Sequence, residues 1–477
     1  MRTLAEQAFS RAAAAPLIEG NAVRLLLDAD ANYAAWLAAI RSAERAVYFE
    51  NYIIKGDATG RLFREVLTER ARAGIKVRVL MDWFGSFGTP RRFWRDLVEA
   101  GGEVRYHNPP RLDDPLGWLS RDHRKSLIVD GRTGHVSGVC VSDVWLGNPA
   151  RKVEPWRDTG IELRGPAACD LLAAFASVWA ANGEPIPEEE IAMQTCATPE
   201  GDTAVRVVAT EPNVSGLYRL DLLVAALAER RLWLTDAYFA GTPSYVQALR
   251  AAARDGVDVR LLVPGGSDLP WLRPLTTAGY RPLLEAGVRV FEWNGSMLHA
   301  KTAVADDRWA RVGSTNLNMA SWLTNYELDV AIEDENFNGE MAAAYERDLE
   351  HSTEIILQQR RRIRLPSPDD GGTRSRPGRG SLARATAGAL RFTRTVSAAI
   401  VSTRILGVDG SESVSAGTLA TIALTLAAIA VLAIFFPTFI AFPFAVVALT
   451  AATIIVIRAW RLRAAIRKAA SDAPPPA

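Results

Sequence analysis

Two short segments of the chain repeat one spacing of a histidine, a lysine and an aspartate. Segments 123–130 and 299–306 both follow the pattern H-x-K-x-x-x-x-D. The residues concerned are His123, Lys125 and Asp130 in the first segment and His299, Lys301 and Asp306 in the second. Only 5 histidines occur in 477 residues, so two in identical settings indicate two related half-sites. Paired imidazole and ammonium groups suit the transfer of a phosphoryl group through a histidine.

The residues that follow each lysine favour a β-strand. Segments 126–129 and 302–305 are mostly apolar and contain β-branched residues, which strands prefer. Residues two apart on a strand share a face, so each strand is expected to present an imidazole beside an ammonium. An aspartate then begins a predicted turn into a returning strand. We keep both aspartates in the catalytic set, although bracing the hairpin is the stronger expectation for them.

The similarity between the two halves extends upstream of the motifs. Segments 46–54 and 231–239 are strand-like, and each precedes a helical stretch, a glycine and a second β-branched run. This alternation is typical of βαβ units around a largely parallel sheet. The sequence therefore predicts an α/β fold of two tandem repeats, at 20–200 and 201–360, which form one pseudo-twofold catalytic body. Two independent domains with unrelated roles are the alternative.

Charge is spread unevenly along the chain. From residue 360 onward the chain carries 16 Lys and Arg against 5 Asp and Glu, a net charge of +11, whereas the preceding part has a net charge of −10. An acidic body argues against duplex nucleic acid as a partner, because such partners require clustered cations. A basic tail instead suggests an anionic membrane surface.

The C-terminal region predicts a membrane anchor. Residues 361–412 form a basic linker, within which an amphipathic surface helix and a solvated connector both fit the sequence. Residues 413–457 contain no charged side chain. A single helix of this length would be roughly 68 Å long, far more than a hydrocarbon core of about 30 Å. Prolines near the middle therefore favour a two-helix transmembrane hairpin at 413–458; a buried helical pair in a soluble protein is the alternative.

Neither a metal ion nor another cofactor is expected. Three scattered cysteines, Cys140, Cys169 and Cys196, show no CxxC spacing, so we expect no disulfide framework and a reducing compartment. The three remaining histidines, His107, His135 and His351, have no partner at metal-ligand spacing. We expect these histidines to be structural.

The paired motifs and their flanks resemble the phospholipase D superfamily, whose members carry two HxKxxxxD motifs. The second motif continues as Gly313-Ser-Thr-Asn316 and Asn325-Tyr-Glu327, and the first continues as Ser137-Gly-Val-Cys140 and Trp156-Arg-Asp158-Thr159. The resemblance covers about residues 20–360. Among subfamilies, bacterial cardiolipin synthases are the most similar, especially over 306–317.

The resemblance implies a two-step mechanism. One histidine attacks a phosphodiester to give a phosphohistidine, while the other protonates the leaving alcohol and then activates the incoming alcohol or water. By the same resemblance, His123 would be the nucleophile and His299 the acid and base. The supporting set would be Lys125, Lys301, Asn316 and Ser314 around the phosphate, with Asp158 and Glu327 holding the second ring nitrogens of the histidines.

Two positions depart from the superfamily pattern. Cys140 stands where an asparagine is expected, so one phosphate-binding amide is missing from the first half. Gly138 stands where a serine is expected. The predicted site is therefore asymmetric, and its second half is the more complete.

These observations predict a membrane-bound phosphatidyltransferase that resembles cardiolipin synthase and acts on phosphatidylglycerol and a second lipid alcohol. The basic flanks of the hairpin place the body on the cytoplasmic side of the bacterial inner membrane by the positive-inside rule. A hydrolytic phospholipase D would use the same residues and is the first competing hypothesis. Two weaker hypotheses are a phosphodiesterase or nuclease of the same superfamily and a noncatalytic membrane scaffold. No nucleic-acid partner is expected.

Overall fold

The computed structural model describes residues 2–110, 120–192, 198–268 and 273–357. Met1–Arg362 form one compact unit, and both HxK motifs lie in it. The predicted basic linker at 361–412 and the predicted transmembrane hairpin at 413–458 lie outside the described residues. Within the described part of the chain, no helix combines the length and apolar character needed to cross a membrane.

Fifteen strands of the described residues form one sheet. The first half supplies β1 (Ile18–Leu27), β2 (Ala46–Asn51), β3 (Lys76–Asp82), β4 (Glu103–His107), β5 (Lys125–Val129), β6 (Thr133–Ser137) and β7 (Thr159–Arg164). The second half supplies β8 (Thr203–Thr210), β9 (Arg231–Thr235), β10 (Asp258–Pro264), β11 (Arg289–Trp293), β12 (Thr302–Ala305), β13 (Trp309–Gly313), β14 (Glu327–Glu333) and β15 (Ser352–Ile355). The strand order is β15-β11-β10-β9-β12-β13-β14-β8-β1-β7-β6-β5-β2-β3-β4. Counted outward from the central β8–β1 pair, seven strands of each half follow the same order, and β15 is added at the outer edge of the second half.

The expectation of a largely parallel sheet is wrong. Parallel pairing is confined to β2-β3-β4 and β9-β10-β11. The βαβ units predicted upstream of each motif are present, but each motif strand then pairs antiparallel with the strand that follows it. The turns after the motif strands are too short for the crossover connection that parallel pairing requires. The predicted hairpins after the two motifs therefore form.

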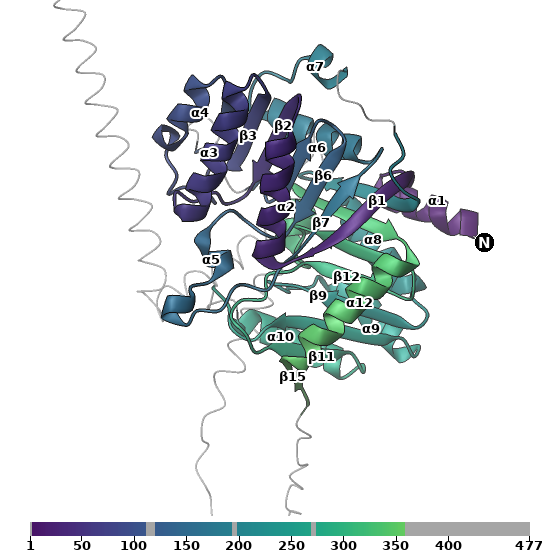
Figure 1. The fold of residues 1–477 in the computed structure, drawn as a ribbon. Coiled ribbons are helices and arrows are strands. Elements are labelled where there is room, and N and C mark those ends of the chain that lie inside the picture. The colour runs from purple at the N-terminus through teal and green to yellow at the C-terminus, as the bar shows by residue number, and fades with distance from the viewer. Residues whose placement is uncertain (1, 111–119, 193–197, 269–272, 358–477) are drawn as a thin grey trace, which may run out of the picture. The chain divides into compact units, whose positions relative to one another are not determined.

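Helices cover the sheet on both sides of each half (Figure 1). They are α1 (Arg2–Ala13), α2 (Asp28–Ser42), α3 (Ala58–Arg72), α4 (Arg95–Glu99), α5 (Asp143–Leu146), α6 (Ala168–Ala181), α7 (Glu188–Ala192), α8 (Gly216–Leu227), α9 (Pro243–Arg254), α10 (Arg273–Leu284), α11 (Met319–Leu323) and α12 (Glu335–Glu350). In α2, buried Tyr33, Trp36, Leu37 and Ile40 recur at helical spacing, which gives the helix one apolar face. That face joins a core cluster with α3 and the first-half strands, and α8 and α9 pack on the second half in the same way.

One further core cluster joins the two halves. It contains residues of α6, α12 and strands from both repeats. Strand β13 also contacts β6 and β7, which are not its neighbours in the sheet order. The central strands of the two halves therefore pack against each other, and the loops at their ends can meet.

One expectation about the cysteines is wrong. Cys169 is disulfide-bonded, because spacing along a sequence gives no signal for the side chains that a fold brings together. Cys140 is a buried free thiol. Burial raises the pKa of Cys140, which keeps this thiol protonated and unreactive.

Candidate active site

Backbone hydrogen bonds tie the segment around each histidine to the other half of the molecule. The amide of His123 donates to the carbonyl oxygen of Tyr326 over 2.9 Å. In the corresponding place, the amide of His299 donates to the carbonyl oxygen of Arg157 over 2.7 Å. Tyr326 and Arg157 are the residues immediately before Glu327 and Asp158. The two halves thus exchange the segments that carry the predicted carboxylates.

Each histidine is paired with a carboxylate from the other half. His123 Nδ1 lies 2.9 Å from Glu327 Oε2, and His299 Nδ1 lies 2.8 Å from Asp158 Oδ2. A carboxylate on Nδ1 fixes the ring orientation and leaves Nε2 as the reactive nitrogen. The sequence indicated both carboxylates, but spacing within one repeat cannot show that the repeats exchange them.

The two carboxylates are held by different donors. Ser314 Oγ donates to Glu327 Oε2 over 2.6 Å. The first half has Gly138 at the position of Ser314, and there Trp145 Nε1 donates to Asp158 Oδ2 over 3.0 Å. A Cβ atom on Gly138 would lie 2.1 Å from Asp158 Oδ1, so the carboxylate occupies the space that a serine side chain would need. Trp145 therefore takes the place of the expected serine, and no spacing signal in the sequence pointed to it.

Both lysines are buried beside their histidines. Lys125 Nζ donates to the backbone oxygen of His123, and Lys301 Nζ donates to the backbone oxygen of His299. Less than 2 % of either lysine is exposed. Two ammonium groups in a site of low polarity create a strong attraction for an anion, as a bound phosphodiester would require.

Two tyrosines that the sequence did not single out line the site. The Tyr52 ring lies 4.9 Å from the His123 ring, and the Tyr238 ring lies 5.9 Å from the His299 ring, between centroids. Lys125 Nζ is 5.1 Å from the Tyr52 ring centroid. Tyr52 directly follows the end of β2, whereas Tyr238 lies three residues after the end of β9. The two tyrosines therefore do not occupy equivalent positions in the repeat alignment, and no spacing signal in the sequence pointed to them.

Burial and the two ammonium groups control the charge of the histidines. Burial lowers the pKa of His123, the Glu327 carboxylate opposes this effect, and both lysines add to it, so the net shift is downward. Burial and the lysines likewise lower the pKa of His299 to about 4. Lys301 acts on His123 and Lys125 acts on His299, so the two half-sites share one electrostatic environment. Both imidazoles are therefore neutral at neutral pH, as a nucleophile must be. A bound phosphate anion would favour protonation of the histidine that acts as the acid.

Lys301 is expected to set the alkaline limb of the pH profile. Burial lowers the pKa of Lys301 to about 8, so its positive charge is present below that pH and is lost as the pH rises through it. kcat/KM should therefore fall above about pH 8. In Lys301→Arg this limb should move to higher pH, because a guanidinium stays charged. The measurement is kcat/KM against pH for both proteins with substrate in micelles; the same limb in both would assign it to another group.

The motif aspartates hold backbone amides. Asp130 accepts hydrogen bonds from the amides of residues 44–46, and Asp306 accepts them from the amides of residues 229–231, at 2.8–3.2 Å. Both aspartates have positive φ, 55° and 46°, as turn residues often do. Their carboxylates fix the beginnings of β2 and β9 against the motif hairpins. We propose a structural role for them, in place of direct contact with substrate.

Asp130→Ala and Asp306→Ala are expected to reduce stability more than catalysis. Each change leaves backbone amides without their acceptor, at a cost of about 1–3 kcal/mol in the free energy of unfolding. kcat/KM of the folded protein should stay within about threefold of the parent value. Chemical denaturation and turnover assays measure the two effects. A large loss of kcat/KM at unchanged stability would give the aspartates a catalytic role.

Asn316 is the remaining predicted site residue, and it follows Ser314, which holds Glu327. Asn316 is buried, and its Oδ1 has no hydrogen-bond partner among the described residues. Among those residues, no group of three or more His, Cys, Asp and Glu side chains is arranged to hold a metal ion. Of the other histidines, His107 and His135 are buried. His351 directly follows the last residue of α12 and is exposed.

The fold and the site define an enzyme class: two α/β repeats that together build one phospholipase D-type site. A family model described as "Cardiolipin synthase, PLD-like domain" matches residues 224–349. "Cardiolipin synthase A" of Pseudomonas aeruginosa is 34% identical over 368 residues, which cover 75% of this chain and 73% of the relative. "Cardiolipin synthase" of Alkalihalophilus pseudofirmus is 30% identical over 344 residues, which cover 71% and 68%.

A solved structure shares the fold. The crystal structure of phosphatidylserine synthase from Haemophilus influenzae matches with a TM-score of 0.58 at 14% identity, covering 74% of this chain and 92% of that one. The chain belongs to the cardiolipin synthase family, within the phospholipase D superfamily. The resemblance inferred from the paired motifs is thus confirmed.

Proposed function

We propose that this chain is a membrane-bound phosphatidyltransferase that takes a phosphatidyl group from phosphatidylglycerol and passes it to a second lipid alcohol. The observation that carries the proposal is the pair of histidines, each held by a carboxylate from the other half and each beside a buried lysine. The cardiolipin synthases among its relatives support the choice of substrate.

In the first step, His123 Nε2 attacks phosphorus and the bond to the glycerol oxygen breaks. His299 gives its Nε2 proton to that oxygen, so glycerol leaves as a neutral alcohol and a phosphatidyl-histidine remains. In the second step, His299 accepts the proton of the incoming lipid alcohol, whose oxygen displaces His123 from phosphorus. Lys125, Lys301 and Asn316 stabilise the nonbridging oxygens in both steps.

Glu327 and Asp158 stabilise the charge that develops on the imidazoles. Burial raises the pKa of each carboxyl. The paired histidine and a nearby lysine lower the pKa by a larger amount, so the net shift is downward for both carboxyls. The two carboxylates therefore stay ionised throughout the reaction and hold the rings in place.

Water in place of the lipid alcohol would give hydrolysis by the same residues. To separate the outcomes, the full-length chain in detergent is incubated with phosphatidylglycerol, and lipid and glycerol products are followed. Cardiolipin with one equivalent of glycerol is the expected result. Phosphatidic acid alone would indicate a hydrolytic phospholipase D, and cleavage of single-stranded DNA without lipid turnover would indicate a nuclease.

Inner-membrane anchoring by the hairpin at 413–458, with the body on the cytoplasmic side, belongs to the same proposal. Its support is the basic residues on both flanks of the charge-free segment. The disulfide at Cys169 favours an oxidising compartment and therefore counts against the cytoplasmic side of the membrane. Labelling of Val153→Cys, an exposed position, by a membrane-impermeant maleimide in whole cells decides: labelling only after lysis supports the cytoplasmic side, and labelling of intact cells refutes it.

A further inference from the structure

An aromatic and basic segment follows β3 at the same end of the sheet as the histidines. Residues 83–95 contain no acidic side chain. We call six of them the aromatic–arginine face: Trp83, Phe84, Phe87, Arg91, Arg92 and Arg95. Phe84 is 53% exposed and Phe87 is 71% exposed, and the three arginines are also exposed. Exposed aromatic rings beside arginines are typical of segments that lie at a membrane interface.

The exposed rings are carried by an ordered turn. Asp82 Oδ1 accepts hydrogen bonds from the amides of Phe84 and Gly85, each over 2.9 Å. Ser86 Oγ donates to the backbone oxygen of Tyr52 over 3.1 Å. Since the turn is fixed at both ends, the fold itself holds Phe84 and Phe87 towards solvent.

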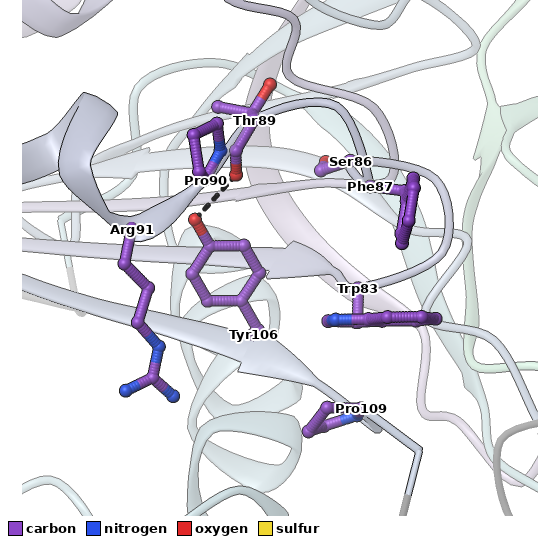
Figure 2. A pocket seen from close by; sticks show the side chains of 8 residues that line it. All are labelled: Trp83, Ser86, Phe87, Thr89, Pro90, Arg91, Tyr106 and Pro109. Atoms are coloured by element: carbon purple, nitrogen blue, oxygen red, sulfur yellow. Dashed lines mark hydrogen bonds between the residues drawn. The ribbon is translucent and has the colours of Figure 1, made fainter. Parts of the chain in front are cut away.

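Two cavities adjoin this face. Figure 2 shows the smaller one, of about 190 Å³, where the rings of Trp83, Phe87 and Tyr106 lie around the opening with Arg91 beside them. The larger cavity, of about 730 Å³, shares Arg91, Tyr106 and Pro109 with the smaller one. It adds apolar residues such as Val98, three further arginines and a single acidic residue, Glu99. A space with both apolar walls and guanidinium groups suits a molecule with an anionic head and hydrocarbon chains.

The face is connected to the reactive histidine through few residues. Asp82, which holds the turn, also accepts a hydrogen bond from the amide of Asp122 over 3.0 Å, and Asp122 directly precedes His123. Tyr52, whose backbone oxygen anchors the turn, places its ring 4.9 Å from the His123 ring. A surface that contacts the face therefore lies close to the phosphate site.

We propose that the aromatic–arginine face inserts into the surface of an anionic phospholipid bilayer and brings the histidine pair to the lipid phosphodiester. Phe84 and Phe87 would enter the interface, and the arginines would bind phosphate groups of the lipids. The charge of the face is complementary to an anionic membrane. The proposal rests on the lipid phosphodiesterase chemistry proposed above.

Insertion is tested on the full-length chain with an environment-sensitive fluorophore on Phe87→Cys. Leu227→Cys is the matched control, because Leu227 is also exposed, at 48%. Leu227 is the last residue of α8, just before the beginning of β9, and so lies away from the histidines. With phosphatidylglycerol vesicles, the label at 87 should shift to shorter wavelength and be quenched by nitroxide-bearing lipid chains, whereas the label at 227 should not. Neither effect should occur with phosphatidylcholine vesicles. Equal responses at both positions, or none at 87 on vesicles that bind the protein, would overturn the proposal.

A second measurement separates docking from chemistry. Phe84→Ser with Phe87→Ser should lower turnover of vesicle lipid at least tenfold, while turnover of lipid dispersed in detergent micelles stays at the parent level. Equal losses in both assays would refute a docking role. Insertion of the label in a parent protein that turns over no lipid would instead refute the proposed function and leave the docking surface standing.

A second, independent observation concerns the amide that the first half lacks. Asn51 on β2 pairs with Lys125 on β5 in the sheet register, and opposed residues of antiparallel strands have side chains on the same face. Asn51 is fully buried, and its Nδ2 has no hydrogen-bond partner among the described residues. An unpaired buried donor is costly unless a ligand satisfies it.

The corresponding position in the second half carries no amide. There Asp236 follows β9, and its Oδ1 accepts the amide of Leu317 over 2.8 Å. The second half thus has Asp236 with Asn316, and the first half has Asn51 with Cys140. We infer that Asn51 Nδ2 donates to a nonbridging phosphate oxygen beside Lys125, so that each half contributes one amide from a different position.

The test is a rescue experiment with bis(p-nitrophenyl) phosphate, which requires no particular lipid. Asn51→Ala should lower kcat/KM at least tenfold, and Asn51→Ala with Cys140→Asn should recover at least half of the parent value. Cys140→Asn alone should stay within threefold of the parent. An equal loss with and without Cys140→Asn at an unchanged melting temperature, or an unchanged kcat/KM in Asn51→Ala, would overturn the assignment. A parent protein active here but inactive on phospholipid would refute only the proposed lipid substrate.

Discussion

His123→Ala and His299→Ala are each expected to lower phosphatidyl transfer by about 10⁴-fold or more, because each removes a group that takes part in bond making or proton transfer. The two variants should differ with an activated substrate. A phosphatidyl ester of p-nitrophenol needs no proton on its leaving group, so His299→Ala should release one equivalent of p-nitrophenol per chain and stop at the phosphohistidine. His123→Ala should release none.

The exposed His351 supplies the control for these variants. His351→Ala should keep full turnover and show no stalled adduct. Mass spectrometry of the stalled protein should locate the phosphatidyl group on His123. An adduct on His299, trapped in His123→Ala, would reverse the assignment of nucleophile and acid without altering the two-histidine mechanism.

Glu327→Gln and Asp158→Asn are expected to lower kcat by up to about 10⁴-fold, the loss that follows removal of the orienting carboxylate in a comparable triad. Each amide is nearly isosteric with the acid, so the folded protein should form. The loss arises because a neutral amide neither fixes the productive tautomer nor stabilises the imidazolium.

The exchange between halves gives this prediction a sharper readout. Glu327 raises the pKa of His123, and Asp158 raises that of His299, so removing each carboxylate should lower the pKa of the histidine in the opposite repeat. Nuclear magnetic resonance of protein labelled at its 5 histidines can follow both rings. Glu327→Gln should shift the titration of His123 and leave that of His299 in place. A shift of the histidine in the same repeat would contradict the observed pairing.

Much of the local structure followed from sequence. The apolar residues after Lys125 and Lys301 form β5 and β12, and the aspartates that follow them begin turns into antiparallel strands. These features depend on neighbours in the chain, where residue type and spacing carry the information. The sheet as a whole was predicted wrongly, because βαβ units fix the direction of their own strands and leave the remaining pairings open.

The sequence identified most residues of the site, but it did not show which of them contact each other. His123 and Glu327 are separated by 204 residues, and no periodic pattern reports a contact of that range. Trp145 was missed for the same reason, since its indole reaches Asp158 only because Gly138 leaves room for the carboxylate. The buried donor of Asn51 also depends on strand register, which becomes visible only in the fold.

The exchanged carboxylates have a consequence for the chain during its synthesis. His123 has no partner until residue 327 has left the ribosome, and His299 cannot meet Asp158 until both repeats have folded together. A nascent chain with only its first repeat folded therefore exposes an imidazole without its orienting acid. Because each histidine takes its carboxylate from the other repeat, neither half-site is complete until both repeats have folded.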